Sequence, residues 1–225
     1  MKMNDLLEQL KKLWKYIWYG ESIGSYLLTF LVAFLFIKFI FFPILGFTLN
    51  TDFPIVAIVS GSMQHKIVDN DICGFRVLDR ENEKLDLKSF WEICGEYYEK
   101  NYNISQEDFS NFDYSKGLYV GDVMVLYGKK YENIYVGDVL VFIPENLQWY
   151  QSHGPVIHRV VDRWQDKDDK WFYRTKGDWN EKSFANFEQN ISQDNVIGVP
   201  ILRVPFIGYA KIYLNKAFMF FIGIF

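Results

Sequence analysis

The sequence has little cysteine, little histidine and no excess of positive charge, and each shortage argues against a class of function. It contains two cysteines and three histidines, and its formal net charge is -4 at pH 7. Cys73 and Cys94 fit no zinc-binding spacing, so they predict no metal site, and whether they pair stays open. The basic residues are scattered among acids, whereas a nucleic-acid binder needs a clustered basic surface. We therefore expect no metal, no cofactor and no nucleic-acid partner.

Apolar and aromatic residues are plentiful instead. The chain is 50% hydrophobic and contains 21 Phe, 15 Tyr and 7 Trp among its 225 residues. This composition is typical of a protein that contacts lipid headgroups, or of one with a large aromatic core. The length leaves room for one membrane segment and one compact domain.

The N-terminal region predicts a membrane anchor. Residues 1–22 place four lysines among apolar residues at helical spacing, which is typical of an amphipathic helix at a membrane surface. Residues 23–49 are almost wholly apolar, and about 20 such residues span a bilayer core. A cleavable signal peptide is the competing interpretation, but the apolar run is too long and no small-x-small site follows it.

Charges and helix breakers indicate how this anchor is oriented. The lysines precede the span, so the positive-inside rule places residues 1–22 in the cytoplasm and the chain after Asn50 outside it. Lys38 is the one charge within the span, and it must snorkel or face a partner. Pro43 and Gly46 predict a bend where the helix leaves the membrane.

Residues 50–205 predict a mainly β domain outside the cytoplasm. Short apolar runs flanked by Gly, Pro, Asn or Asp indicate strands at residues 53–59, 72–78, 123–126, 139–143, 156–164 and 171–175. In the stretch 79–116 apolar residues fall near helical spacing among many charges, so we expect an insertion with one or two short helices. The repeated pair Gly121-Asp122 and Gly137-Asp138 predicts a turn followed by a strand, used twice.

The first candidate for chemistry is a serine pair that follows the strand 53–59. A serine hydroxyl is a weak nucleophile near neutral pH, so it needs a base within hydrogen-bond reach and donors for the oxyanion. In Ser60-Gly61-Ser62, Ser62 could attack while its backbone N–H and the Ser60 hydroxyl stabilise the intermediate. Taken alone, the motif is more typical of a polar turn.

The second candidate is a histidine that interrupts an apolar strand. On a strand His158 shares a face with Val156 and Val160, while Arg159 points the other way. The histidine side chain suits proton transfer near pH 7, although a lone histidine in this setting is more often a core residue. Downstream, the turn that contains Asp178 could supply a carboxylate that orients an imidazolium.

Together and in this order, these segments resemble the archaeal and endoplasmic-reticulum branch of the signal peptidase I family. That branch carries an S-G-S-M box after a membrane helix, a G-D-V-hydrophobic-V-F strand, a P-hydrophobic-hydrophobic-H-R-V strand and a T-K-G-D turn. The matching segments are residues 60–63, 137–142, 155–160 and 175–178. Four boxes in the right order are specific, whereas any one of them alone would not be.

The resemblance implies a serine endopeptidase that cleaves N-terminal signal peptides from exported preproteins. It implies Ser62 as nucleophile, His158 as base and Ser60 as an oxyanion donor, and it implies Asp178 as an orienting or structural acid. The family fold is β-rich, its substrate adds as an extended strand, and its shallow pockets accept small side chains. The side chains expected to flank this substrate groove are Val56, Ile58, Val139 and Val141.

Two departures from the family pattern leave assignments open. Gln64 and His65 stand where members have a nearby Pro, and the insertion 79–116 follows before the next Gly-Asp pair. Phe184 occupies the place of a second Asp, so the acid could be Asp178 or one of Glu181, Glu188 and Asp194. The alternative bases are His65 and His153.

The C-terminal residues 206–225 are apolar but contain Lys211 and Lys216, so an interfacial helix and a second span are equally expected. The expected location is the cell membrane, or the endoplasmic reticulum membrane in a eukaryote. Candidate partners are signal peptides, the lipid bilayer, and a translocon or accessory subunits. Two other functions stay open: a non-catalytic, membrane-anchored β module of the export machinery, and a related protease that cuts a regulator.

Overall fold

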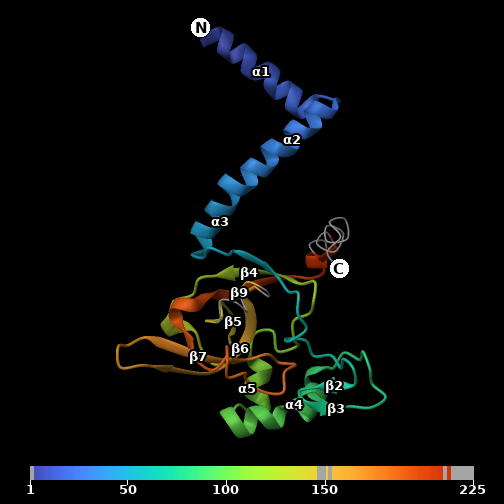
Figure 1. Ribbon diagram of the computed structural model, residues 1–225, viewed down its shortest axis with the longest axis vertical. Coiled ribbons are helices and arrows are strands. Elements are labelled where there is room, and N and C mark those ends of the chain that lie inside the picture. The colour runs from blue at the N-terminus through green and yellow to red at the C-terminus, as the bar shows by residue number, and fades with distance from the viewer. Residues whose placement is uncertain (1–2, 146–150, 152–153, 210–211, 214–225) are drawn as a thin grey trace. The chain divides into compact units, whose positions relative to one another are not determined.

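The computed structural model describes residues 3–145, 151, 154–209 and 212–213 (Figure 1). It divides into two compact units, of which the first ends at Thr48 and the second begins at Leu49.

The first unit is helical except for the short connection at residues 20–22. Helix α1 (Met3–Tyr19) has the predicted amphipathic sequence, and the helical segments α2 (Ile23–Phe36), η1 (Ile37–Phe41) and α3 (Phe42–Leu49) follow it. The Ser22 side chain caps α2 by accepting a hydrogen bond from the Ser25 N–H at 3.1 Å. Two hydroxyls then tie α2 to the end of α1: Ser25 donates to the Tyr16 carbonyl, and Thr29 donates to the Ile17 carbonyl.

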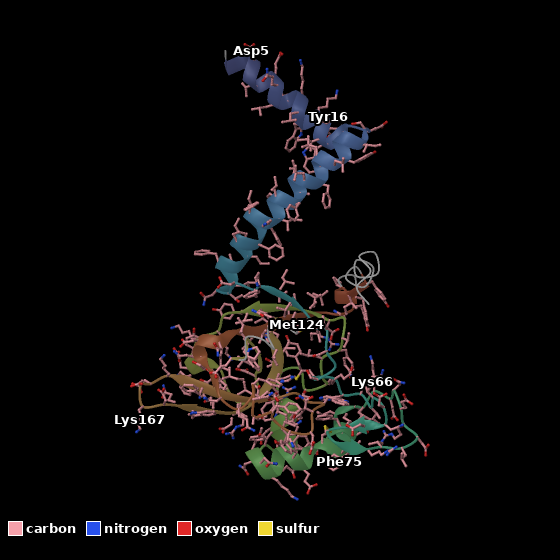
Figure 2. All side chains as sticks on the ribbon, viewed as in Figure 1. Asp5, Tyr16, Lys66, Phe75, Met124 and Lys167 are labelled. Carbon is pink, nitrogen blue, oxygen red and sulfur yellow. A yellow bond between two sulfur atoms is a disulfide. The ribbon has the colours of Figure 1, made fainter. Side chains whose placement is uncertain are left out.

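The segments α2, η1 and α3 form a candidate membrane span of 27 residues, Ile23–Leu49, with a mean hydropathy of 2.5. Its large apolar side chains are exposed and project outward from the ribbon (Figure 2). Length and composition carry this assignment, so the crossing itself stays a prediction.

The helix continues past Pro43 and Gly46 to Leu49. Just before Pro43, η1 is a π-helical turn in which the Phe42 N–H reaches back five residues to the Ile37 carbonyl. Because proline lacks an N–H and crowds the carbonyl four residues before it, a wider turn relieves that contact.

The second unit confirms the mainly β prediction. Its main sheet has seven antiparallel strands in the order β1-β4-β9-β5-β6-β7-β8 (Figure 1). The strands are β1 (Ile55–Ala57), β4 (Val123–Tyr127), β5 (Val139–Phe142), β6 (Val156–Gln165), β7 (Trp171–Lys176), β8 (Ile191–Ser192) and β9 (Val196–Val204). Short 3₁₀ turns cover η2 (Tyr131–Asn133) and η3 (Gln193–Asn195).

The sequence pattern did not predict two strands of this sheet, β8 and β9. The more important of the two is β9. It lies between β4 and β5 and joins the two halves of the sheet. Gly198 and Pro200 within it resemble strand breakers, but both sit where the pairing shifts register, with Gly198 opposite Val141 and Pro200 opposite Leu126. Irregular pairing at these points tolerates residues that a regular ladder would exclude.

The predicted strand 72–78 is wrong, because the chain reverses within it. A separate hairpin pairs β2 (Asp71–Ile72) with β3 (Phe75–Arg76). The reversal uses positive φ angles at Cys73 (56°) and Gly74 (76°), which are the conformations of a two-residue hairpin turn.

The helical insertion, residues 79–116, contains α4 (Leu87–Tyr102) and α5 (Gln106–Asn111), as predicted. Asp86 caps α4, and Ser105 with Asp108 forms a capping box at α5. The insertion lies beside the hairpin β2-β3, and Phe90, Trp91 and Tyr98 pack into one core with it (Figure 1). A disulfide between Cys73 and Cys94 links the hairpin to α4.

The two Gly-Asp pairs form the same turn, as the repeat predicts. Gly121 and Gly137 both have positive φ angles, 91° and 98°. Asp122 accepts the Tyr119 N–H at 2.8 Å, and Asp138 accepts the Tyr135 N–H at 2.9 Å. Each turn thus delivers the chain into a strand, β4 or β5.

Candidate active site

Ser62 lies just after β1, in a segment that the core holds in place. Met63 beside it is fully buried, and its carbonyl accepts the Leu118 N–H at 2.9 Å. The Gln64 N–H closes a turn by donating to the Gly61 carbonyl at 3.1 Å. An apolar anchor at Met63 therefore holds two hydroxyls, those of Ser60 and Ser62, at the end of the strand.

His158 comes from β6, which is paired on both sides by β5 and β7. Its Nε2 lies 2.9 Å from Ser62 Oγ, although the two residues are 96 positions apart in the chain. Ser60 Oγ lies 3.2 Å from Ser62 Oγ. The structure thus brings Ser60, Ser62 and His158 together, and His158 is only 4% exposed.

A buried carboxylate lies on the other side of the imidazole, and it belongs to Glu188. Its Oε1 contacts His158 Nδ1, while its Oε2 accepts the Phe184 N–H at 2.7 Å. The Glu188 carbonyl accepts the Thr175 N–H at 2.9 Å, which fixes this residue against β7. Ser62, His158 and Glu188 therefore form a continuous chain of hydrogen-bonding groups.

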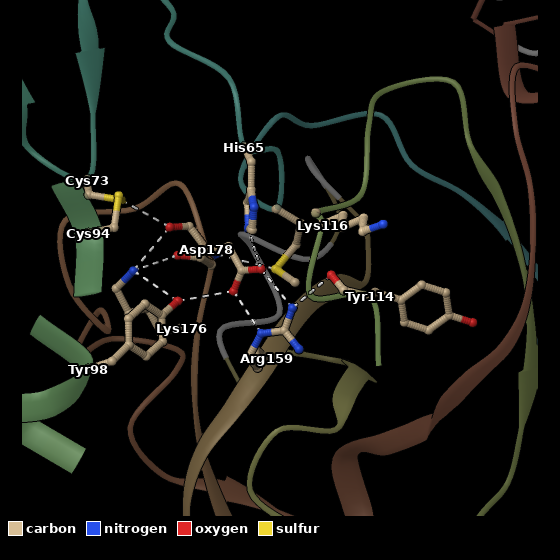
Figure 3. A network of polar contacts seen from close by, with 12 residues as sticks. His65, Cys73, Cys94, Tyr98, Tyr114, Lys116, Arg159, Lys176 and Asp178 are labelled. Carbon is tan, nitrogen blue, oxygen red and sulfur yellow. Dashed lines mark hydrogen bonds and ion pairs between the residues drawn. A yellow bond between two sulfur atoms is a disulfide. The ribbon is translucent and has the colours of Figure 1, made fainter. Parts of the chain in front are cut away.

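Asp178 does not have the expected orienting role, because its carboxylate does not contact His158. It accepts hydrogen bonds from Arg159 Nε at 3.0 Å and Nη2 at 2.8 Å, and it contacts His65 Nε2 at 3.2 Å. Figure 3 shows Asp178 between His65, Arg159 and Tyr98. Adjacent residues of a strand point to opposite faces, so a carboxylate on the Arg159 side of β6 faces away from His158.

Electrostatics fix Asp178 in its charged form. Burial alone would raise its pKa, but the Arg159 guanidinium and the hydrogen bonds from His65 and Arg159 lower the pKa below its usual range. Burial also lowers the pKa of His65, which is fully buried. Asp178 therefore belongs to a charged, structural network behind the site.

The remaining candidates lie elsewhere. Asp194 is exposed and pairs with Lys170 at 3.4 Å, and the Glu181 side chain packs over Gly74. His65 contacts Asp178 and stacks on Phe90. His153 lies outside the described residues. Of the four candidate acids, Glu188 has the contact with His158.

A cavity of about 450 Å³ opens beside the Ser62 hydroxyl. Its walls are mostly apolar, and they come from the end of β1 and the segment after it, the start of β6, Asn180, and Phe187 beside Glu188. The lining residues are Ala57, Ile58, Val59, Ser60, Ser62, Pro155, Val156, Ile157, His158, Asn180 and Phe187.

The predicted groove residues are only partly in this lining. Ile58 lines the cavity, whereas Val139 and Val141 are buried in the core and Val56 packs against that core. Across the cavity from β1 lies the start of β6, rather than β5 as expected. Since β1 is the last strand of the sheet, its outer edge has no ladder partner among the described strands.

The turn 177–180 closes the site from behind, and sequence reasoning missed this part. The Trp179 N–H donates to the Ser62 carbonyl at 2.9 Å, and Asn180 lines the cavity. A Cβ on Gly177 would lie 2.8 Å from that carbonyl and 2.9 Å from His158 Nε2, so only glycine fits there. The T-K-G-D box was the sequence signal for this turn. The two residues that follow the box, Trp179 and Asn180, also reach the site.

The arrangement can perform nucleophilic chemistry, because a hydroxyl, an imidazole and a carboxylate are aligned beside an apolar cavity. Among the described residues, no cluster of three or more His, Cys, Asp or Glu could hold a metal ion.

Comparison with known proteins finds a relative among the signal peptidases. No family model matches the chain. The chain is similar to the signal peptidase complex catalytic subunit SEC11 of Plasmodium falciparum, with 29% identity over 107 residues. The matched region is 44% of this chain and 53% of SEC11, so the chain spans about half the length of that relative. This similarity supports the resemblance to signal peptidases.

Proposed function

We propose that this chain is a membrane-anchored serine endopeptidase that removes signal peptides from exported preproteins. The observation that carries the proposal is the 2.9 Å approach of Ser62 Oγ and His158 Nε2 at the wall of an apolar cavity. The similarity to a signal peptidase catalytic subunit supports the choice of substrate.

In the first half-reaction, His158 Nε2 takes the proton of the Ser62 hydroxyl as Oγ attacks the scissile carbonyl carbon. Glu188, at Nδ1, keeps the ring in the tautomer that can accept this proton and stabilises the resulting imidazolium. His158 then gives the proton to the leaving amine, and an acyl ester on Ser62 remains.

In the second half-reaction, His158 takes a proton from water, whose oxygen attacks the ester. The proton returns to Ser62 Oγ as the peptide acid leaves. Two donors serve the oxyanion in both halves, the Ser62 backbone N–H and the Ser60 hydroxyl, which lies 3.2 Å from Ser62 Oγ. Loss of one such donor typically costs 10² to 10³ in kcat.

The substrate would bind as an extended strand along the outer edge of β1, which has no ladder partner among the described strands. Backbone pairing gives affinity without reading sequence, and the apolar cavity selects the side chains next to the cut. The family resemblance implies that small side chains are preferred there.

The domain boundaries belong to the same proposal. Residues 1–22 would lie at the cytoplasmic surface, 23–49 would anchor the chain, 50–205 would form the extracytoplasmic catalytic domain, and 206–225 would contact the membrane. The Cys73–Cys94 disulfide supports an oxidising compartment for the catalytic domain. The likeness to SEC11 favours an endoplasmic-reticulum type of enzyme, with signal peptides, lipid and translocon or accessory subunits as partners.

The test is cleavage of a membrane-embedded preprotein by the full chain in liposomes. We expect Ser62→Ala and His158→Ala to reduce processing to background. Ser110→Ala is the matched control, because its hydroxyl bonds only the Glu107 carbonyl of its own helix, and it should process normally. Equal processing by wild type and Ser62→Ala would remove Ser62 from the mechanism. The remaining hypothesis would then be a non-catalytic, membrane-anchored β module.

A second pair of substrates separates signal peptidase activity from that of a protease that cuts a regulator. We expect cleavage of a substrate whose site follows an apolar segment, and little cleavage of the same site without that segment. Equal rates on both substrates would contradict the signal peptidase assignment.

A further inference from the structure

We infer that the helical insertion positions the nucleophile: Tyr98 and the Cys73–Cys94 disulfide hold the turn 177–180 against Ser62. This inference rests on the proposed function, because it concerns the alignment of the same serine. The insertion has no part in the chemistry described above. Three links, each made of contacts between described residues, connect it to Ser62.

The first link joins the turn 177–180 to the reacting pair. The Trp179 N–H donates to the Ser62 carbonyl at 2.9 Å. Gly177 packs so closely against that carbonyl and His158 Nε2 that no Cβ fits between them. A shift of this turn would therefore move the peptide that carries Ser62.

The second link joins the hairpin β2-β3 to the same turn. The Cys73 N–H donates to the Trp179 carbonyl at 2.9 Å, so one residue receives a hydrogen bond from Cys73 and gives one to Ser62. The Trp179 indole also donates to the Lys66 carbonyl at 3.0 Å. Trp179 is thus held between the hairpin and the segment that follows the nucleophile.

The third link joins α4 to both the hairpin and the turn. Cys94 on α4 forms the disulfide with Cys73, and one helical turn later the Tyr98 hydroxyl donates to Asp178 Oδ1 at 3.1 Å. Lys176 Nζ donates to the Gly177 carbonyl at 3.1 Å and lies 3.4 Å from the Tyr98 hydroxyl (Figure 3). The carbonyls of Gly177, Asp178 and Trp179 and the Asp178 carboxylate therefore each have a partner that is linked to α4.

The segment after the nucleophile is fixed by the same insertion. The His65 ring lies parallel to the Phe90 ring, with the ring centroids 3.6 Å apart, and its Nε2 contacts Asp178. Tyr98, Lys176, Asp178 and His65 are all fully buried, so the charges and polar atoms they carry cannot find water when one partner is lost. Loss of one partner should therefore displace the turn.

The test measures kcat and KM for preprotein cleavage by the full chain in liposomes, with single-turnover rates to exclude product release. Tyr98→Phe removes only the hydroxyl, and we expect kcat to fall about tenfold with KM within twofold, since a misplacement of about 1 Å can cost 10²-fold. The matched control is Tyr173→Phe, which also removes a buried tyrosine hydroxyl, one that donates to the Tyr131 carbonyl at 2.7 Å in another core. Its kcat should stay unchanged.

The disulfide gives a reversible version of the same test. Wild-type kcat should fall on treatment with dithiothreitol and return on reoxidation, whereas a variant with Cys73→Ser and Cys94→Ser should have a low kcat that dithiothreitol does not change. If the double variant fails to fold, Tyr98→Phe still decides the question. A reduced wild type that is folded and keeps its full kcat, together with Tyr98→Phe equal to Tyr173→Phe, would overturn the inference.

Hydrogen exchange separates this inference from the proposed function. Exchange of backbone amides in residues 176–180 should rise in Tyr98→Phe and stay unchanged in Tyr173→Phe, whether or not the chain cleaves preproteins. Equal processing by Ser62→Ala would refute the proposed function alone. Unchanged exchange in Tyr98→Phe would refute the positioning role alone.

Discussion

Replacing Glu188 by glutamine tests which acid serves His158. The two side chains have the same shape, but glutamine offers one acceptor and one donor in place of two acceptors. In the structure one carboxylate oxygen faces His158 Nδ1 and the other accepts the Phe184 N–H at 2.7 Å. The amide oxygen of glutamine can satisfy only one of these two sites.

The Phe184 N–H decides how the glutamine side chain is oriented. If the amide oxygen faced His158, two N–H groups would meet at Phe184, and a buried unsatisfied donor costs about 1 to 3 kcal/mol. The oxygen should therefore stay on Phe184, and the amide NH₂ should donate to His158 Nδ1. The imidazole then carries its proton on Nε2, where it faces Ser62 as a donor and cannot take the serine proton.

We therefore expect Glu188→Gln to lower kcat by about 10² to 10⁴ with little change in KM, in the range known for an inverted histidine tautomer. The assay is steady-state cleavage of a preprotein in liposomes, with the ¹⁵N shifts of the His158 ring as an independent report of the tautomer. Asp194→Asn is the control, because Asp194 is exposed and pairs only with Lys170. If Glu188→Gln kept kcat within twofold of wild type, Glu188 would not be the acid that sets the His158 tautomer.

Three further predictions concern the turn at Gly177, the buried Lys176 and the cap of α4. Gly177→Ala should lower kcat at least tenfold in the same assay, because its Cβ would lie 2.8 Å from the Ser62 carbonyl; a fully active variant would show that the turn moves freely. Burial lowers the pKa of Lys176 from 10.5 to about 8. Between about pH 8 and pH 10.5 the unfolded chain therefore binds more protons than the folded chain. The free energy of unfolding should rise with pH across this range, by up to about 3 kcal/mol. Urea denaturation at pH 7.5 and 10 should show this rise in wild type and lack it in Lys176→Met. Asp86→Ala removes the cap of α4 and should lower the free energy of unfolding by about 1 kcal/mol, measured in urea at pH 7.5; no loss would mean that the cap is dispensable.

The sequence pattern located much of the fold because apolar runs and turn residues alternate clearly along the domain. Four strands, β4 to β7, end within one residue of the predicted ranges, and β1 is two residues shorter than predicted at each end. The pattern failed at β9, where Gly198 and Pro200 resemble breakers but occupy register shifts that depend on the neighbouring strands. It also failed at Cys73, because a positive φ at a cysteine has no signal in a single sequence.

The site was predictable where the chemistry depends on local pattern and not where it depends on long-range packing. Strand alternation placed His158 and Arg159 on opposite faces of β6. Because Asp178 is the partner of Arg159, the same rule would have separated this acid from His158. Glu188 lies in an irregular turn with no periodicity, held by hydrogen bonds to Phe184 and Thr175. Only the folded chain brings that turn to the imidazole.

Because β1 is short, a substrate strand can pair with its edge only weakly. A peptide that pairs with the outer edge of Ile55–Ala57 gains only about three backbone hydrogen bonds, or about 2 to 4 kcal/mol. In free solution that energy corresponds to millimolar or weaker affinity. Confinement of enzyme and preprotein in the same bilayer would raise their effective concentration enough to compensate. Such weak edge pairing would also let the cleaved product depart quickly, so the site would stay open for the next chain.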